Sequence, residues 1–132
     1  MERRPVGGYV SLIVGIFLLT FLSLGMHHSI KTGNLQRNEV LGFRMRSTLA
    51  SDEAWEVGHR KTLPYLQATT VCGAVGIATS ISVPILFGND SPSSLGVIYV
   101  FPILAFLIQI VIIVLAALKA NGEAKVFNSK KR

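Results

Sequence analysis

The sequence predicts an all-α membrane protein with three transmembrane helices, and with a cytoplasmic loop and a short amphipathic surface helix between the first two. Half of the 132 residues are hydrophobic, and the mean hydropathy is +0.51. The apolar residues gather in three runs of about 20 or more, each long enough at about 1.5 Å per residue to cross a hydrocarbon core of roughly 30 Å. No Asp, Glu, Lys or Arg lies within these runs. At this length we expect a single membrane domain over residues 1–132.

The first span is predicted over residues 6–27, after a short basic head. A basic start followed by an apolar run is also the layout of a cleaved signal peptide. However, this run is longer than the core of a signal peptide, and its exit, Gly25-Met26-His27-His28, contains no small-x-small cleavage site. We therefore expect the segment to stay in the membrane as a helix.

The two histidines at this exit raise the question of a metal site, with His59 as a third ligand. Adjacent side chains on a helix point about 100° apart, so His27 and His28 are poorly placed to bind one ion together. No Asp or Cys stands beside them at ligand spacing. We expect a polar membrane exit, with no metal site and no cofactor.

The polar stretch of residues 38–60 is predicted to carry the function. Six of the 13 Lys and Arg residues and four of the seven acidic residues lie between Lys31 and Lys61. Ser51 is a suitable N-cap, after which acidic residues meet the positive end of a helix dipole. We predict a surface helix over about 52–61, with Trp55 at the level of the lipid headgroups. Three- and four-residue spacings place five side chains on one face of this helix: Asp52, Trp55, Glu56, His59 and Arg60.

Residues in this stretch resemble the signature of the SdpI-like family, the sporulation-delaying-protein immunity proteins and their short relatives. In that family an Asn precedes a Gly-x-Arg-Thr-Pro-x-Thr-Leu segment, and a Trp and a Thr-His-Arg follow. The matching residues here are Asn38, Gly42, Phe43, Arg44, Thr48, Leu49, Ser51, Glu53, Trp55, His59 and Arg60. Met45 and Arg46 stand where the family usually has Thr-Pro, and Gly58 stands where a Thr usually precedes the His.

The resemblance implies a small multi-pass membrane protein of bacteria. Members are linked to protection against a secreted membrane-active peptide toxin, and to holding a repressor at the membrane. It therefore implies a function for the polar stretch in partner binding.

The second span is predicted over residues 64–87, with Pro64 in its first turn, where a missing backbone donor is tolerated. Small residues repeat every four positions along it, and the first span has two at the same spacing. Such stripes let helices approach closely, so we expect these two spans to pack through them, with a homodimer or a foreign helix as the alternative. The residues are Ala68, Cys72, Gly76 and Ser80 in the second span, and Ser11 and Gly15 in the first.

The third span is predicted over residues 95–118, after a short turn at 88–94 that makes it an antiparallel neighbour of the second. Gln109 is its only strongly polar interior residue, and we expect it to form an interhelical hydrogen bond rather than a binding site. Residues 119–132 are polar and end in Ser-Lys-Lys-Arg. We expect this tail to be flexible and attracted to anionic lipid.

Three spans place the amino terminus and the 88–94 turn on one side of the membrane. That side has two basic residues, Arg3 and Arg4, and the other side has the remaining 11 of the 13. The positive-inside rule therefore predicts a cell-membrane protein with its amino terminus outside and its carboxyl terminus in the cytoplasm.

A non-catalytic membrane protein that binds a protein or peptide partner is the preferred interpretation. The expected partner- or lipid-binding residues are Asn38, Gly42, Arg44, Arg46, Thr48, Trp55, His59 and Arg60. The same residues could instead only seat the loop on anionic headgroups of the bilayer. The net charge of +6 does not indicate nucleic acid, because the basic residues flank apolar segments.

Two other functions stay open at this point. The chain could be an accessory subunit of a larger membrane complex, such as a respiratory supercomplex, because a small-residue stripe without an internal site fits that equally well. An intramembrane enzyme is disfavoured, since no nucleophile–base pair, carboxylate pair or metal-ligand spacing lies in or near the spans.

Overall fold

A computed structural model describes residues 6–37, 42–87 and 92–132, and these residues form helices joined by short connections. The helices are α1 (Val6–Lys31), the 3-10 turn η1 (Thr48–Ala50), α2 (Asp52–Arg60), α3 (Leu63–Phe87) and α4 (Pro92–Lys130). The described residues contain three helices long and apolar enough to cross a membrane, namely α1, α3 and α4. The all-α fold class is confirmed, and Pro64 lies in the first turn of α3 as predicted.

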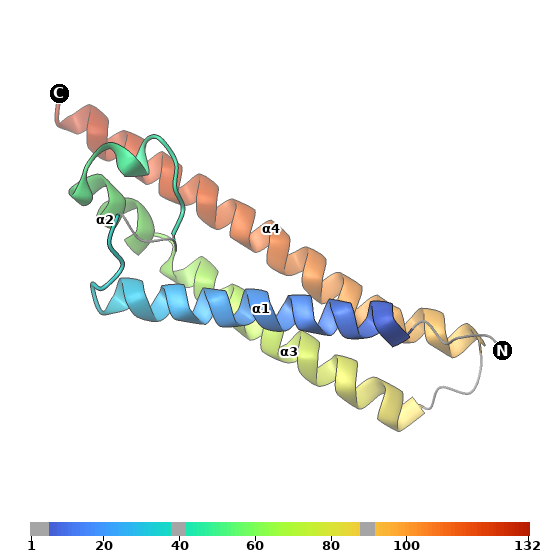
Figure 1. Cartoon of the computed structure of the whole chain (residues 1–132). Helices are drawn as coiled ribbons and strands as arrows, with labels where there is room; N and C mark the ends of the chain where they lie inside the picture. Colours follow the sequence, from blue (N-terminus) through green and yellow to red (C-terminus); the bar gives the residue numbers. More distant parts are fainter. Residues whose placement is uncertain (1–5, 38–41, 88–91) are drawn as a thin grey trace.

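The three long helices pack pairwise into a bundle, and η1 and α2 lie beside the carboxyl-terminal end of α4 (Figure 1). We call residues 33–37 and 42–62, together with residues 119–132, the cap. Ile30, Leu35, Trp55 and Leu66 form a buried apolar cluster where the cap meets the bundle. The cap is therefore a folded region that continues the bundle beyond its apolar part.

The prediction of a flexible tail is wrong, because α4 continues as one helix to Lys130. Ala120 and Ala124 are buried, and α2 and η1 pack against this part of α4. Lys119 and Glu123 pair one turn apart at 2.9 Å, and Ala, Lys and Glu are good helix formers. Tertiary packing on an alanine face thus orders a segment whose polarity suggested a loose end.

The predicted helix-packing stripes are only partly right. Ala68 lies on the exposed face of α3, and Ser11 is exposed and bonds to the carbonyl of Gly7 in its own helix. Gly15 faces the ring of Phe106 on α4 instead of α3. Four-residue spacing drifts around a helix with 3.6 residues per turn, so the Ala68 end of the α3 stripe leaves the contact face while Gly76 and Ser80 stay buried.

The face of α3 that packs on α1 and α4 combines predicted and unpredicted residues. A Cβ on Gly76 would meet that of Ala105 on α4 at 2.5 Å, and one on Gly73 would collide with Thr20 on α1 and with Gln109. Cys72 is half-buried. Tyr9 on α1 donates a hydrogen bond to the carbonyl of the buried Ser80. The two glycines let three backbones approach closely at one level of the bundle.

Gln109 lies at this crossing and is fully buried. Its Nε2 donates to Thr20 Oγ1 on α1 at 2.9 Å and to the Thr69 carbonyl on α3 at 3.2 Å. The predicted interhelical hydrogen bond is confirmed, and one amide joins all three long helices.

Candidate functional site

The amino-terminal cap of α2 orients the predicted motif. Ser51 is the N-cap, and its Oγ accepts the Ala54 backbone N–H at 3.0 Å, as predicted. Asp52 and Glu53 occupy the first turn, where carboxylates favour the helix dipole. The helix ends at Arg60, close to the predicted boundary.

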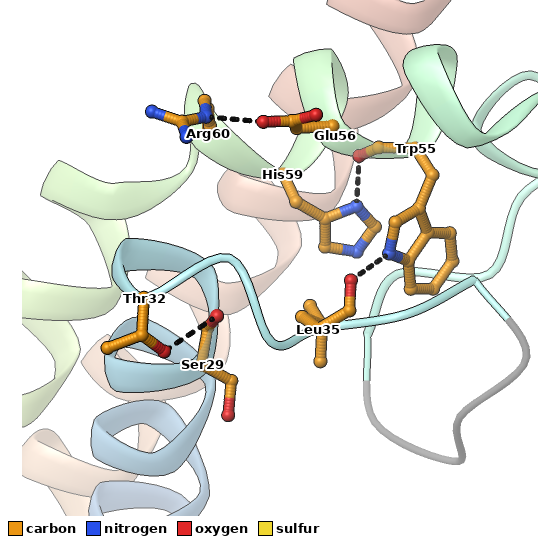
Figure 2. A network of polar contacts seen from close by, with 7 residues as sticks. All are labelled: Ser29, Thr32, Leu35, Trp55, Glu56, His59 and Arg60. Carbon is orange, nitrogen blue, oxygen red and sulfur yellow. Dashed lines mark hydrogen bonds and ion pairs between the residues drawn. The ribbon is translucent and has the colours of Figure 1, made fainter.

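Trp55 is buried inside the cap, so its indole does not face the lipid headgroups as the side chain of an aromatic belt would. Its side chain is 3% exposed, and its Nε1 donates to the Leu35 carbonyl at 3.0 Å (Figure 2). The indole therefore ties α2 to the segment that leaves α1, twenty residues earlier in the chain. The acceptor is a backbone atom in an irregular segment, which no residue pattern reveals.

His59 is buried beside Trp55, and the structure assigns a partner to each of its ring nitrogens. Nδ1 lies 2.8 Å from the Trp55 carbonyl and donates to it, and Nε2 accepts the Phe43 backbone N–H at 2.8 Å. The bond accepted at Nε2 requires the neutral ring, and burial lowers the pKa of His59 below its ordinary value, against the smaller raising effect of the Trp55 carbonyl. The ring centroid lies 4.0 Å from that of Trp55 and 5.7 Å from that of Phe43. The imidazole is thus a structural acceptor here, and neither nitrogen is available to a metal ion.

Gly42 allows the loop to pass over these rings. Its φ of +122° is a conformation that side chains with a Cβ rarely adopt. A Cβ at this position would lie 2.6 Å from two atoms of the Trp55 ring and 3.0 Å from His59 Nε2. Both the backbone angle and the space therefore require glycine.

Thr48 closes the loop from the other side. It is buried, and its Oγ1 lies 2.7 Å from the Phe43 carbonyl as donor and 3.0 Å from the Met45 N–H as acceptor. This hydroxyl holds the turn between Phe43 and η1. Four of the eight predicted binding residues, Gly42, Thr48, Trp55 and His59, are therefore used to build the cap.

The end of α4 supports the motif from outside. A Cβ on Gly58 would lie 2.8 Å from the Ala120 carbonyl, so glycine permits close contact between α2 and α4. Asn128 Nδ2 donates to the Ser47 carbonyl at 3.0 Å. Gly58, one of the departures from the family pattern, thus fits the close approach of α4.

The arginines of the motif lie at the surface, apart from the buried rings. Arg44 and Arg46 are exposed, and Arg60 turns outward to pair with Glu56 at 3.0 Å. The imidazole and the Arg60 guanidinium, predicted to share one face, therefore do not form a joint site. Asn38 lies outside the described residues.

Residues 33–37 and α2 line an open cavity of about 400 Å³. Trp55 and His59 contribute to its wall, and Arg37 pairs with Asp52 at 3.1 Å within its lining. Arg37 was not predicted as a site residue, although it lies among the charges between Lys31 and Lys61. The remaining lining residues are Ile30, Gly33, Leu35, Gln36 and Glu56.

Comparison with known proteins agrees with the motif. The sequence model of the SdpI/YfhL protein family matches residues 34–117, which are more than half of the chain. The match begins in the segment that accepts the Trp55 hydrogen bond and ends within α4. No curated protein and no solved structure matches the chain.

Proposed function

The chain belongs to the SdpI/YfhL family of membrane proteins, and we propose that it is a non-catalytic member whose cap binds a protein or peptide partner. Family membership points to toxin immunity or to sequestration of a regulator at the membrane. The observation that carries the proposal is the mixed-charge cavity, whose wall includes the motif residues Trp55 and His59. We further propose that the cap lies in the cytoplasm of a bacterial cell with the amino terminus outside, a proposal supported by the 11 of 13 basic residues on the side of the cap and by the family resemblance.

The cavity suits a short polypeptide segment. Its lining combines apolar side chains with Arg37, Asp52 and Glu56, so both backbone polar groups and charged side chains of a ligand would find partners. The buried hydrogen bonds of Trp55 and His59 fix the wall, and a rigid wall lowers the entropy cost of binding. Arg60 and Glu56 continue the polar surface outward.

In-cell photo-crosslinking tests the proposal. Gln36 is exposed at the cavity and is the position for the crosslinker, whereas Trp55 is buried and unsuitable. Gly122 is the matched control, because it is exposed in the cap with open space around it and lines neither the cavity nor the basic cleft described below. We expect a protein or peptide adduct from position 36 that is absent from position 122.

Lipid adducts alone at position 36 would contradict partner binding. Deletion of the gene with a gain in toxin sensitivity would support immunity. A stable stoichiometric membrane partner after mild detergent extraction would instead support the accessory-subunit interpretation.

A further inference from the structure

A second concave site lies between the loop before η1 and the last turns of α4. It is a cleft of about 410 Å³ that shares no lining residue with the cavity beside Trp55. Three of its seven lining residues are cationic, and the lining contains no carboxylate side chain. The lining residues are Arg46, Ser47, Ala50, Lys125, Asn128, Ser129 and Arg132.

The cations come from two segments that are far apart in the sequence. Arg46 precedes η1, whereas Lys125 and Arg132 lie at the end of α4, and all three are exposed. The hydrogen bond from Asn128 to the Ser47 carbonyl joins the two walls. The juxtaposition of Arg46 with Lys125 is therefore part of the fold of the cap.

Neutralisation of the negative end of the α4 dipole would be the ordinary role for basic residues here. Lys130 lies in the last turn, and Lys131 pairs with Glu53 at 2.6 Å. Dipole compensation does not account for Arg46, which belongs to another segment. Within the described residues, no ion pair is formed by Arg46, Lys125 or Arg132. Within the part of the chain that the structure describes, the cleft thus gathers three like charges that no ion pair offsets.

We propose that this cleft binds a phosphate group. A terminal phosphate group has three non-bridging oxygens in a tetrahedral arrangement and up to two charges, so it can accept donors that converge from several directions. A carboxylate, with two coplanar oxygens and one charge, matches three cations less well. The Ser47 side chain adds a hydroxyl donor at the same rim, whereas the Ser129 hydroxyl already donates to the Val126 carbonyl at 2.8 Å.

The position of the cleft favours a soluble phosphate over a lipid headgroup. Lys125 lies six residues beyond Lys119, or about 9 Å along the helix axis. The headgroup layer on each side of the hydrocarbon core is only about 5–8 Å thick. Lys119 follows the apolar run of α4, so we take it as the edge of the hydrocarbon core. If α4 is perpendicular to the membrane, the cleft then lies at or beyond the outer edge of the headgroups.

Pyrophosphate binding to the full chain in nanodiscs of neutral phosphatidylcholine tests the site, measured by calorimetry at low salt. We expect binding that weakens about tenfold in Arg46→Gln and in Lys125→Gln, the effect of losing one charge-assisted contact at an exposed site. Arg60→Gln is the matched control, since this exposed cap arginine lies outside the cleft, and it should leave the affinity unchanged.

A second arm identifies the source of the phosphate. If phosphatidic acid in the nanodisc weakens pyrophosphate binding to the wild type by competition, a lipid phosphate reaches the cleft. If it does not, the ligand is soluble. The site would be overturned by absence of pyrophosphate binding up to about 10 mM, or by Arg60→Gln weakening it as much as Arg46→Gln. Trp55 fluorescence of each variant confirms that the cap is folded.

Discussion

The bundle and the cap are held together in different ways. In the bundle, most buried residues are small or aliphatic, and the long-range polar contacts include those of Gln109 and Tyr9. In the cap, the Trp55 indole, both nitrogens of His59 and the Thr48 hydroxyl each bond to a specific backbone atom. The bundle relies on close backbone approach in lipid, whereas the cap relies on individual polar atoms that water would otherwise satisfy.

The two regions should therefore respond differently to single substitutions. A lost contact between apolar helices is partly replaced by contact with lipid tails, which are equally apolar. A buried polar atom in the cap has no such replacement and loses its solvation in full. Substitutions at the cap rings should therefore cost more than comparable ones at the helix crossing.

Gly42→Ala is expected to have the largest effect. The substitution combines an unfavourable φ with a Cβ 2.6 Å from the Trp55 ring, so we expect the cap to lose about 2–4 kcal/mol of stability. Trp55 is the only tryptophan, and its fluorescence during denaturant unfolding reports on the cap. Gly33→Ala is the matched control, because its φ of +77° is also positive but its surroundings are open, and it should cost about 1 kcal/mol. Equal losses of stability in both variants would show that contact with the Trp55 ring does not cause the effect of Gly42→Ala.

Acidification is expected to weaken the cap through His59. Its pKa is lower in the folded cap than in the unfolded chain, so the neutral ring contributes stability above the unfolded value of about 6.5. That contribution is lost as the pH falls through the lower folded value, because a protonated Nε2 can no longer accept the Phe43 N–H. The denaturant concentration at the midpoint of unfolding, followed by Trp55 fluorescence, should therefore decrease as the pH is lowered from about 7.5 to about 5.

The variant His59→Phe tests this assignment. It should lower stability at neutral pH and remove most of the pH dependence, because it removes the buried imidazole and its acceptor. Acid sensitivity that persists in His59→Phe would assign it to other groups.

Gln109→Leu in the bundle should have the smallest effect. The substitution removes the two hydrogen bonds that Nε2 donates. It also removes Oε1, a buried acceptor that receives no hydrogen bond from the described residues, and this removal offsets part of the loss. Interhelical hydrogen bonds in membranes average about 0.6 kcal/mol, so we expect a loss below about 1 kcal/mol. Unfolding in mixed micelles measures it, and a loss equal to that of Gly42→Ala would contradict the contrast between the two regions.

Sequence patterns predicted the bundle better than the cap. Apolar runs of about 20 residues give the three spans directly, and a single glutamine among them indicates an interhelical bond. The helical extension beyond Leu118 was missed because its apolar face consists of alanines, Ala120 and Ala124, which carry little hydropathy signal.

The candidate site shows the same limit. Its signature residues were recognised, but Trp55 and His59 were assigned outward roles because their acceptor and donor are the backbone of Leu35 and Phe43. Side-chain spacing within one helix says which residues share a face. It does not say which irregular segment will cover that face.

The continuous α4 helix has a mechanical consequence. It has 39 residues, so it is a rod of about 58 Å. It begins at the end of the bundle opposite the cap, and its last turns line the basic cleft. A tilt of about 5° at its origin would swing its tip by about 5 Å. A change in bilayer thickness or in the neighbouring helices that tilts α4 slightly would thus displace its carboxyl-terminal end further than its middle.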